Sequence, residues 1–205
     1  MKKTLLLASA FVFLTAFSAF AAVNVADRTG TIKIGMPDGT SVTVTADQAL
    51  PAIPDGAVIS IISGTANIST TGSSTVNVTM GRTSVQVSAG SAVSVSFDQA
   101  TGNANIASTS GQVTVTNNGN IATLDSGDAV KVVVNSSTNQ GTLQAETGSV
   151  NVRLADGSST TLDSNHPSLD FQAEAYTPPA LPDVGTVETN VRTEETAKDI
   201  SPIKK

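Results

Sequence analysis

The sequence predicts an all-β protein in which short strands stack around a narrow interior, as a β-solenoid, roll or sandwich, with a disordered C-terminal tail. Short segments of alternating apolar and polar residues recur from Thr31 to about Phe171, separated by Gly, Asn, Asp or Ser. Val, Thr and Ile dominate where a helix would favour Leu, Glu and Lys. Hydrophobic residues make up 39% of the chain, too many for a typical disordered protein, but aromatic residues only 3%. Small aliphatic side chains therefore suit a slim core.

Residues 1–21 are expected to be a signal peptide. Met1-Lys2-Lys3 gives a positive start, an apolar stretch runs to Phe20, and Ala19-Phe20-Ala21 is a small-x-small cleavage site. A retained membrane anchor is the alternative, but the apolar run is short for a bilayer span of about 20 residues and no basic cluster follows. No Cys follows for lipid attachment, and no later segment is apolar enough to cross a membrane. We expect a periplasmic or secreted bacterial protein.

The domain predicted for residues 22–176 contains about fourteen strands, whose starts are mostly about 8 to 12 residues apart. They are 31–36, 40–46, 57–63, 65–70, 74–80, 83–89, 91–98, 103–109, 111–117, 119–125, 129–135, 141–147, 148–155 and 158–164. Residues 169–175 alternate like a closing strand, with a short helix as the alternative. Residues 46–50 can form at most one helical turn before Pro51. In each strand one face is expected to be buried and the other wet.

Three stretches of the chain repeat one pattern, in which Gly-x-apolar-x-apolar leads to a turn glycine. They are Gly30–Gly39, Gly111–Gly119 and Gly148–Gly157. Their turns contain Asp-Gly or Asn-Gly, which accept the positive φ angles of tight hairpins. Repeats of strand and turn stack into units that share one narrow core.

The segment from Gly111 to Val132, with Gly-x-Val-x-Val, a turn, and then Leu124, Gly127 and Val130, resembles the strand pattern of FecR-type domains. These domains are the extracytoplasmic β-rich part of the FecR iron-signalling regulators. The same pattern of glycine and apolar positions recurs around residues 148–162 and, more loosely, in residues 30–58. The resemblance implies a fold for most of the domain and supplies no catalytic residues. FecR regulators also have a cytoplasmic anti-sigma region and a membrane span, and this sequence begins instead with a cleavable signal.

Residues 177–205 begin with Thr-Pro-Pro-Ala-Leu-Pro-Asp and show mixed charge without apolar periodicity. We expect a disordered tail, with a tether or partner-binding peptide as the alternative.

Charge argues against nucleic acid as a partner. Removing Lys2 and Lys3 from the 11 basic residues leaves 9 against 17 acidic residues, a net charge of −8. Phosphate backbones attract clustered Lys and Arg, and the predicted domain has none clustered. A solubilising acidic surface is the simplest interpretation, and calcium or a cationic surface is the electrostatic alternative.

Reactive residues are scarce. The chain has no Cys and a single histidine, which excludes a cysteine nucleophile and a Cys/His zinc site, and it has no Gly-x-Ser-x-Gly elbow. His166 could pair weakly with Asp163 or Asp170, but a turn histidine is the simpler interpretation because no nucleophile motif accompanies it.

Two acidic pairs, Asp125/Asp128 and Asp47/Asp55, are candidates for glycoside hydrolysis or, for Asp125/Asp128, for calcium binding. Aromatic platforms for sugars and known calcium-loop motifs are missing, so these aspartates are predicted to serve turns. We therefore predict no catalytic residue, no cofactor and no metal site.

Outward polar rows are the remaining candidate surface. They could bind water, glycans or another sheet edge, or simply form the wet face of the sheet. They comprise Thr43, Thr45, Asn77, Thr79, Ser94, Ser96, Thr114 and Thr116. The sequence also carries chance matches to glycosylation sequons at Asn67, Asn77 and Asn135.

The predicted function is that of an exported non-catalytic β-repeat protein with a binding or structural role at the cell envelope, whose partner is an unknown envelope protein or glycan. One alternative is a self-associating fibre or adhesin subunit that pairs through open sheet edges. A glycan-active enzyme is the weaker alternative.

Overall fold

The computed structural model describes residues 23–135, 138 and 140–172. These residues form fifteen strands and no helix, which confirms the all-β prediction. The expected signal peptide (1–21) and the tail (177–205) lie outside the described residues, as does the end of the predicted domain. None of the described residues forms a helix with the length and hydrophobicity that a bilayer span requires.

The strands follow the predicted segments closely. They are β1 (Val23–Ala26), β2 (Thr31–Gly35), β3 (Ser41–Thr45), β4 (Val58–Thr70), β5 (Val76–Met80), β6 (Thr83–Val87), β7 (Ala92–Asp98), β8 (Asn103–Ser110), β9 (Val113–Asn117), β10 (Asn120–Leu124), β11 (Ala129–Asn135), β12 (Gln140–Thr147), β13 (Val150–Arg153), β14 (Ser159–Leu162) and β15 (Ser168–Gln172). Residues 169–172 belong to a strand, which decides between the strand and the helix expected for the closing segment.

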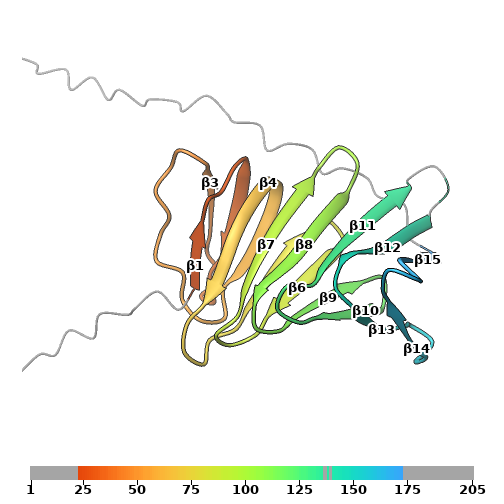
Figure 1. Cartoon of the computed structure of the whole chain (residues 1–205). Helices are drawn as coiled ribbons and strands as arrows, with labels where there is room; N and C mark the ends of the chain where they lie inside the picture. Colours follow the sequence, from red (N-terminus) through yellow and green to blue (C-terminus); the bar gives the residue numbers. More distant parts are fainter. Residues whose placement is uncertain (1–22, 136–137, 139, 173–205) are drawn as a thin grey trace, which may run out of the picture.

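The strands form two layers that share β4, so that one continuous sheet is folded over on itself (Figure 1). Sheet A has the spatial order β1, second half of β4, β7, β8, β11, β12, β15. Sheet B has the order β3, β2, first half of β4, β5, β6, β9, β10, β13, β14. The architecture is a roll whose two layers are continuous at β4 and end separately at β14 and β15.

The start of this sheet differs from the prediction in two places. The sequence predicts separate strands at 57–63 and 65–70, but the structure has the single 13-residue strand β4. Gly64 has the positive φ of a turn residue (+94°), but here it bends the strand from one layer into the other. The strand β1, which pairs with the second half of β4, is absent from the predicted segments.

The bend of β4 lies directly against the link between β1 and β2, which crosses between the layers at the same place. The Thr29 amide donates to the Thr65 carbonyl at 2.9 Å, and the Thr65 amide donates to the Thr29 hydroxyl at 3.0 Å. A Cβ on Gly64 would lie 2.4 Å from the Thr29 carbonyl oxygen, and one on Gly30 would lie 2.2 Å from the Ser63 carbonyl oxygen. Glycine is therefore required at both positions by space as well as by φ.

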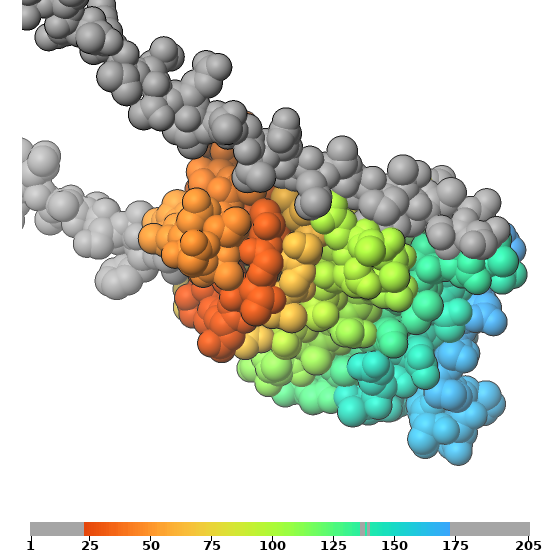
Figure 2. Space-filling view, turned by 90° about the horizontal axis from the view of Figure 1, so that it is seen from above, coloured from red at the N-terminus to blue at the C-terminus, as the bar shows by residue number. Residues whose placement is uncertain are grey.

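Beyond β4 the chain adds hairpins to the two layers alternately. The hairpins β5–β6, β9–β10 and β13–β14 extend sheet B, while β7–β8, β11–β12 and the single strand β15 extend sheet A. Chain order consequently runs from one end of the molecule to the other, as the colour sequence shows in Figure 2. The arrangement confirms the prediction of short strands stacked along one shared interior.

The interior between the layers is filled by small aliphatic side chains. Strands such as β9 and β10 alternate buried and half-buried residues, as the sequence pattern predicted. Most buried hydrophobic residues are Val, Ile, Leu or Ala, and Phe97 is the aromatic residue among them in the described part. Each fully buried aliphatic side chain contributes about 1.5–3 kcal/mol. Burial of this narrow interior is therefore the main force that holds the layers together.

The repeat hairpins at the two extremes of sheet B have matching turns. In the β2–β3 turn, the Met36 amide donates to the Thr40 carbonyl at 2.8 Å, and Asp38 Oδ1 accepts from the Thr40 amide at 2.9 Å. In the β13–β14 turn, the Leu154 amide donates to the Ser158 carbonyl at 2.8 Å, and Asp156 Oδ1 accepts from the Ser158 amide at 2.8 Å.

The third repeat, β9–β10, has a different turn. There Asn118 and Gly119 form a two-residue turn with φ of 50° and 81°. The strand pairing of the repeat is kept in all three hairpins, and the turn is kept in two of them.

Candidate functional site

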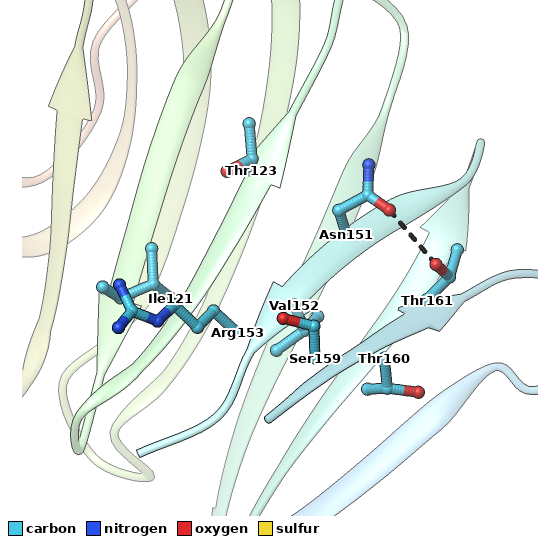
Figure 3. A pocket seen from close by; sticks show the side chains of 8 residues that line it. All are labelled: Ile121, Thr123, Asn151, Val152, Arg153, Ser159, Thr160 and Thr161. Carbon is cyan, nitrogen blue, oxygen red and sulfur yellow. Dashed lines mark hydrogen bonds between the residues drawn. The ribbon is translucent and has the colours of Figure 1, made fainter. Parts of the chain in front are cut away.

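A groove of about 460 Å³ lies on the outer face of sheet B, near its β14 end. Its outward side chains come from three neighbouring strands, two from each: Ile121 and Thr123 on β10, Asn151 and Arg153 on β13, Ser159 and Thr161 on β14. Figure 3 shows these side chains around the groove, with β13 and β14 turned away from β10. The groove is open to solvent.

Arg153 carries the positive charge of the groove. It is opposite Ile121 in the ladder between β10 and β13, and its side chain extends toward Ile121 (Figure 3). No described residue makes a hydrogen bond or an ion pair with its guanidinium. A guanidinium supported by an aliphatic neighbour and open to water can bind a carboxylate, a phosphate or a carbonyl group.

Asn151 and Thr161 are the other fixed polar groups. The Thr161 hydroxyl donates to the Asn151 side-chain oxygen at 3.1 Å, which leaves the Asn151 amide group as a donor toward the groove (Figure 3). Thr123 and Ser159 add hydroxyl groups. None of the described residues that line the groove carries a carboxylate, imidazole or thiol, so these side chains can bind and orient a polar partner but supply no general base.

His166 lies in the turn between β14 and β15. Its backbone amide and that of Asn165 donate to Asp163 Oδ1 at 2.9 and 2.8 Å. Its ring Nδ1 is 3.9 Å from the same oxygen, and the imidazole side chain is 82% exposed. The pairing with Asp163 is therefore a surface contact within a turn. Asp170 is not part of it, because its carboxylate accepts from the Thr142 hydroxyl at 2.7 Å.

The Asp125/Asp128 pair holds a turn together. Asp128 Oδ2 accepts from the Asp125 amide at 2.9 Å, and its Oδ1 accepts from the Ser149 amide at 3.3 Å. Asp125 Oδ1 accepts from the Gln112 side chain at 3.1 Å.

The other pair is divided between different partners. Asp47 accepts from the Thr45 hydroxyl at 2.6 Å, and Asp55 accepts from the Thr75 amide at 3.3 Å. Among the described residues no group of three or more His, Cys, Asp or Glu is placed to hold a metal ion.

Hydrogen bonds lower the pKa values of several aspartates in turns. The hydroxyl and amide of Thr40 lower the pKa of Asp38, and those of Ser158 lower the pKa of Asp156. The backbone amides of His166 and Asn165 lower the pKa of Asp163. In each case the hydrogen bonds favour the charged carboxylate. These carboxylates are local turn caps on the surface.

The predicted polar rows lie on the outside of the sheets, and the exposure of their side chains varies from strand to strand. Thr114 and Thr116 are half-buried on the central strand β9, whereas Thr43 is exposed on the outermost strand β3. Of the sequon residues, Asn67 donates to Asp27 at 3.1 Å and Asn77 is exposed on β5.

The groove itself was missed by sequence reasoning. Arg153 stands out in the sequence only as one of the few cations of the domain, and nothing in the pattern shows that β13 and β14 turn away from β10. The chain matches no family model, no curated protein and no solved structure.

Proposed function

We propose that this chain is an exported, non-catalytic β-repeat protein of FecR-like type that has a binding or structural role at the bacterial cell envelope. The observation that carries the proposal is the distribution of polar groups: Asp125, Asp128 and His166 belong to turns, whereas the polar groups facing the groove are hydroxyls, an amide and one guanidinium. Such a groove suits binding of a polar partner, either a glycan or an envelope protein.

Location is tested by separating the cells into fractions and determining the N-terminus of the protein by mass spectrometry. The proposal expects a chain that begins at Ala22 in the periplasmic or extracellular fraction. A full-length chain found only in the cytoplasm contradicts it.

Binding at the groove is tested by NMR titration with soluble fragments of cell-wall polysaccharide. The proposal expects amide shifts at Thr123, Asn151, Arg153 and Thr161, and at least a tenfold weaker affinity for Arg153→Ala because the guanidinium is lost. Lys131→Ala, on the outer side of β11 in the other layer, is the matched control for charge and should bind like the wild type. Shifts spread evenly over both layers, or equal affinity of both variants, contradict binding at the groove.

A second candidate function is that of a self-associating subunit. It is favoured by the outermost strands of sheet B, because among the described residues β3 has only β2 as a ladder partner and β14 has only β13. Neither strand contains a charged residue or a proline, the features with which sheet edges usually prevent pairing.

A further inference from the structure

We infer that the free edge of β3 binds the free edge of β14 of a second copy of this chain, so that sheet B continues from one molecule into the next. The inference rests on the second candidate function above and names the strands, the direction and the register of that association.

The backbone groups that face each free edge follow from the turns. In an antiparallel ladder, hydrogen-bonded and non-hydrogen-bonded pairs alternate. The Met36 amide bonds to the Thr40 carbonyl, so the next hydrogen-bonded pairs of the β2–β3 ladder are 34/42 and 32/44. The residues between them on β3, namely Ser41, Thr43 and Thr45, therefore direct their backbone amides and carbonyls away from β2, to the free edge. The same alternation applies to β14, where the Leu154 amide bonds to the Ser158 carbonyl. The backbone amides and carbonyls of Ser159 and Thr161 therefore point away from β13, to the free edge.

One of these β3 positions is already occupied. The Thr45 amide donates to Gln48 Oε1 at 2.8 Å, and its carbonyl accepts from the Arg28 guanidinium at 3.2 Å. These contacts agree with the alternation, because they show that the backbone of Thr45 faces away from β2. They leave Ser41 and Thr43 as the open positions, two residues apart like Ser159 and Thr161.

The directions of the outermost strands decide which of the two sheets can continue into a second molecule. Followed through the ladder, β3 and β14 run in opposite directions, so a second copy placed end to end by translation brings them together as an antiparallel pair. In sheet A, β1 and β15 run in the same direction and would meet as a parallel pair. The outer edge of β1 is also occupied by the bridge between Val23 and Ile53. Within the part of the chain that the structure describes, only sheet B therefore presents two compatible, open edges.

The register that uses all four open residues pairs Ser41 with Thr161 and Thr43 with Ser159. All four side chains then lie on the outer face, as they do within each molecule. The register also covers an apolar side chain on the inner face. Val42 points inward on β3 but is 40% exposed, and this register places Thr160 opposite it. With two short edges the association should be weak and should depend on concentration. A head-to-tail contact of this kind does not close on itself, so it produces chains of molecules.

Sedimentation velocity over a concentration series tests the association with the protein as the cell produces it. We expect the mean mass to rise with concentration beyond that of a dimer. Thr43→Lys and Thr161→Lys should each lower the association constant at least tenfold, because a charge blocks the edge. Thr114→Lys, an outward threonine on the central strand β9, carries the same charge and should associate like the wild type. A wild type that stays monomeric at all concentrations overturns this inference and leaves the binding role untouched.

Mixing the two variants tests the direction of the contact. Each variant keeps one free edge, so an equal mixture of Thr43→Lys and Thr161→Lys should form dimers and nothing larger. If Thr161→Lys dimerises by itself, the contact joins β3 to β3 and the head-to-tail arrangement is wrong.

The register can be tested by disulfide formation, because the chain has no natural Cys. Val42 and Thr160 would form a non-hydrogen-bonded pair with Cα atoms about 4.5 Å apart, within the range that a disulfide spans. A mixture of Val42→Cys and Thr160→Cys should give a covalent dimer of both chains on mild oxidation, and neither variant alone should do so. Equal crosslinking of Thr43→Cys with Thr161→Cys would contradict this register.

Discussion

The two ends of the roll are closed in different ways. At the β1–β4 end the layers are covalently continuous through β4, and the segment between β3 and β4 places Ile53, which is 2% exposed, against β1. At the β14–β15 end each layer stops at its own edge. The chain passes from one layer to the other in the turn at 163–167, and the Asn118 side-chain amide of the β9–β10 turn donates to the Gln172 carbonyl of β15. Side chains close this end: Leu162 is buried, and Leu169 and Phe171 pack partly against the core.

The difference teaches that one end of the roll is fixed by backbone geometry and the other by side-chain packing. Regions held by few buried contacts open at a lower free energy than the core. The β14–β15 end is therefore expected to open locally, while the crossing at Gly30 and Gly64 opens only when the whole molecule unfolds. Two substitutions with matched controls, and one pair of substitutions in the two matching turns, test this contrast.

The largest effect is expected for Gly64→Ala. A Cβ at this position meets the Thr29 carbonyl oxygen at 2.4 Å, where two backbone segments leave no room to move. Gly127 is the matched control, because it has the same φ of +94° with open space around it. We expect Gly64→Ala to lower the free energy of unfolding by about 3 kcal/mol or more and Gly127→Ala by about 1–2 kcal/mol, measured by urea denaturation. Equal losses would show that the close crossing contributes nothing.

A smaller and local effect is expected for Gly141→Ala in β12. The added Cβ would lie 2.4 Å from the ring of Phe171, which must then move and loosen β15. Gly35→Ala in β2 is the control, because the nearest atom to its added Cβ is 3.8 Å away. We expect a loss of about 1–2 kcal/mol for Gly141→Ala and faster hydrogen exchange confined to β12 and β15. Faster exchange in β4 as well would contradict the idea that this end opens by itself.

The smallest effect is expected from the turn aspartates. The pKa of Asp156 is lowered from 3.8, so its contribution to stability is fully present above that value and disappears as the pH falls through the lower pKa of the folded state. Asp156→Asn keeps the acceptor but removes the charge. Its melting temperature should be slightly below that of the wild type at pH 6, and the difference should vanish near pH 2. Asp38→Asn should change the melting temperature in the same way, because its turn has the same hydrogen bonds. A difference in melting temperature that persists at pH 2 would show that the charge of the aspartate is not its cause.

The sequence predicted the strands well because their alternation reports directly which residues are buried. The pattern from Val113 to Leu124, for example, yields β9, the Asn118-Gly119 turn and β10. It failed at two points: Gly64 has the signature of a turn but bends a continuous strand, and β1, which has the alternation Val23-Asn24-Val25, lies before Thr31, where the predicted strands begin.

The candidate site was predictable only in part. The Asp128 and Asp163 carboxylates accept from backbone amides two or three residues away, so their role in turns could be inferred locally. The groove at Arg153 depends on how β13 and β14 turn away from β10, and the pairing edges depend on strand order. Both are long-range properties that one sequence does not reveal.

Residue-resolved amide hydrogen exchange tests the central claim most directly, namely that one bent strand joins two layers whose far ends are separate edges. The account predicts strong protection along both halves of β4, including Ile61 and Ile68, and rapid exchange in dilute solution at Ser41, Thr43, Ser159 and Thr161. Rapid exchange in the middle of β4, together with strong protection at those four edge amides in the monomer, would contradict it.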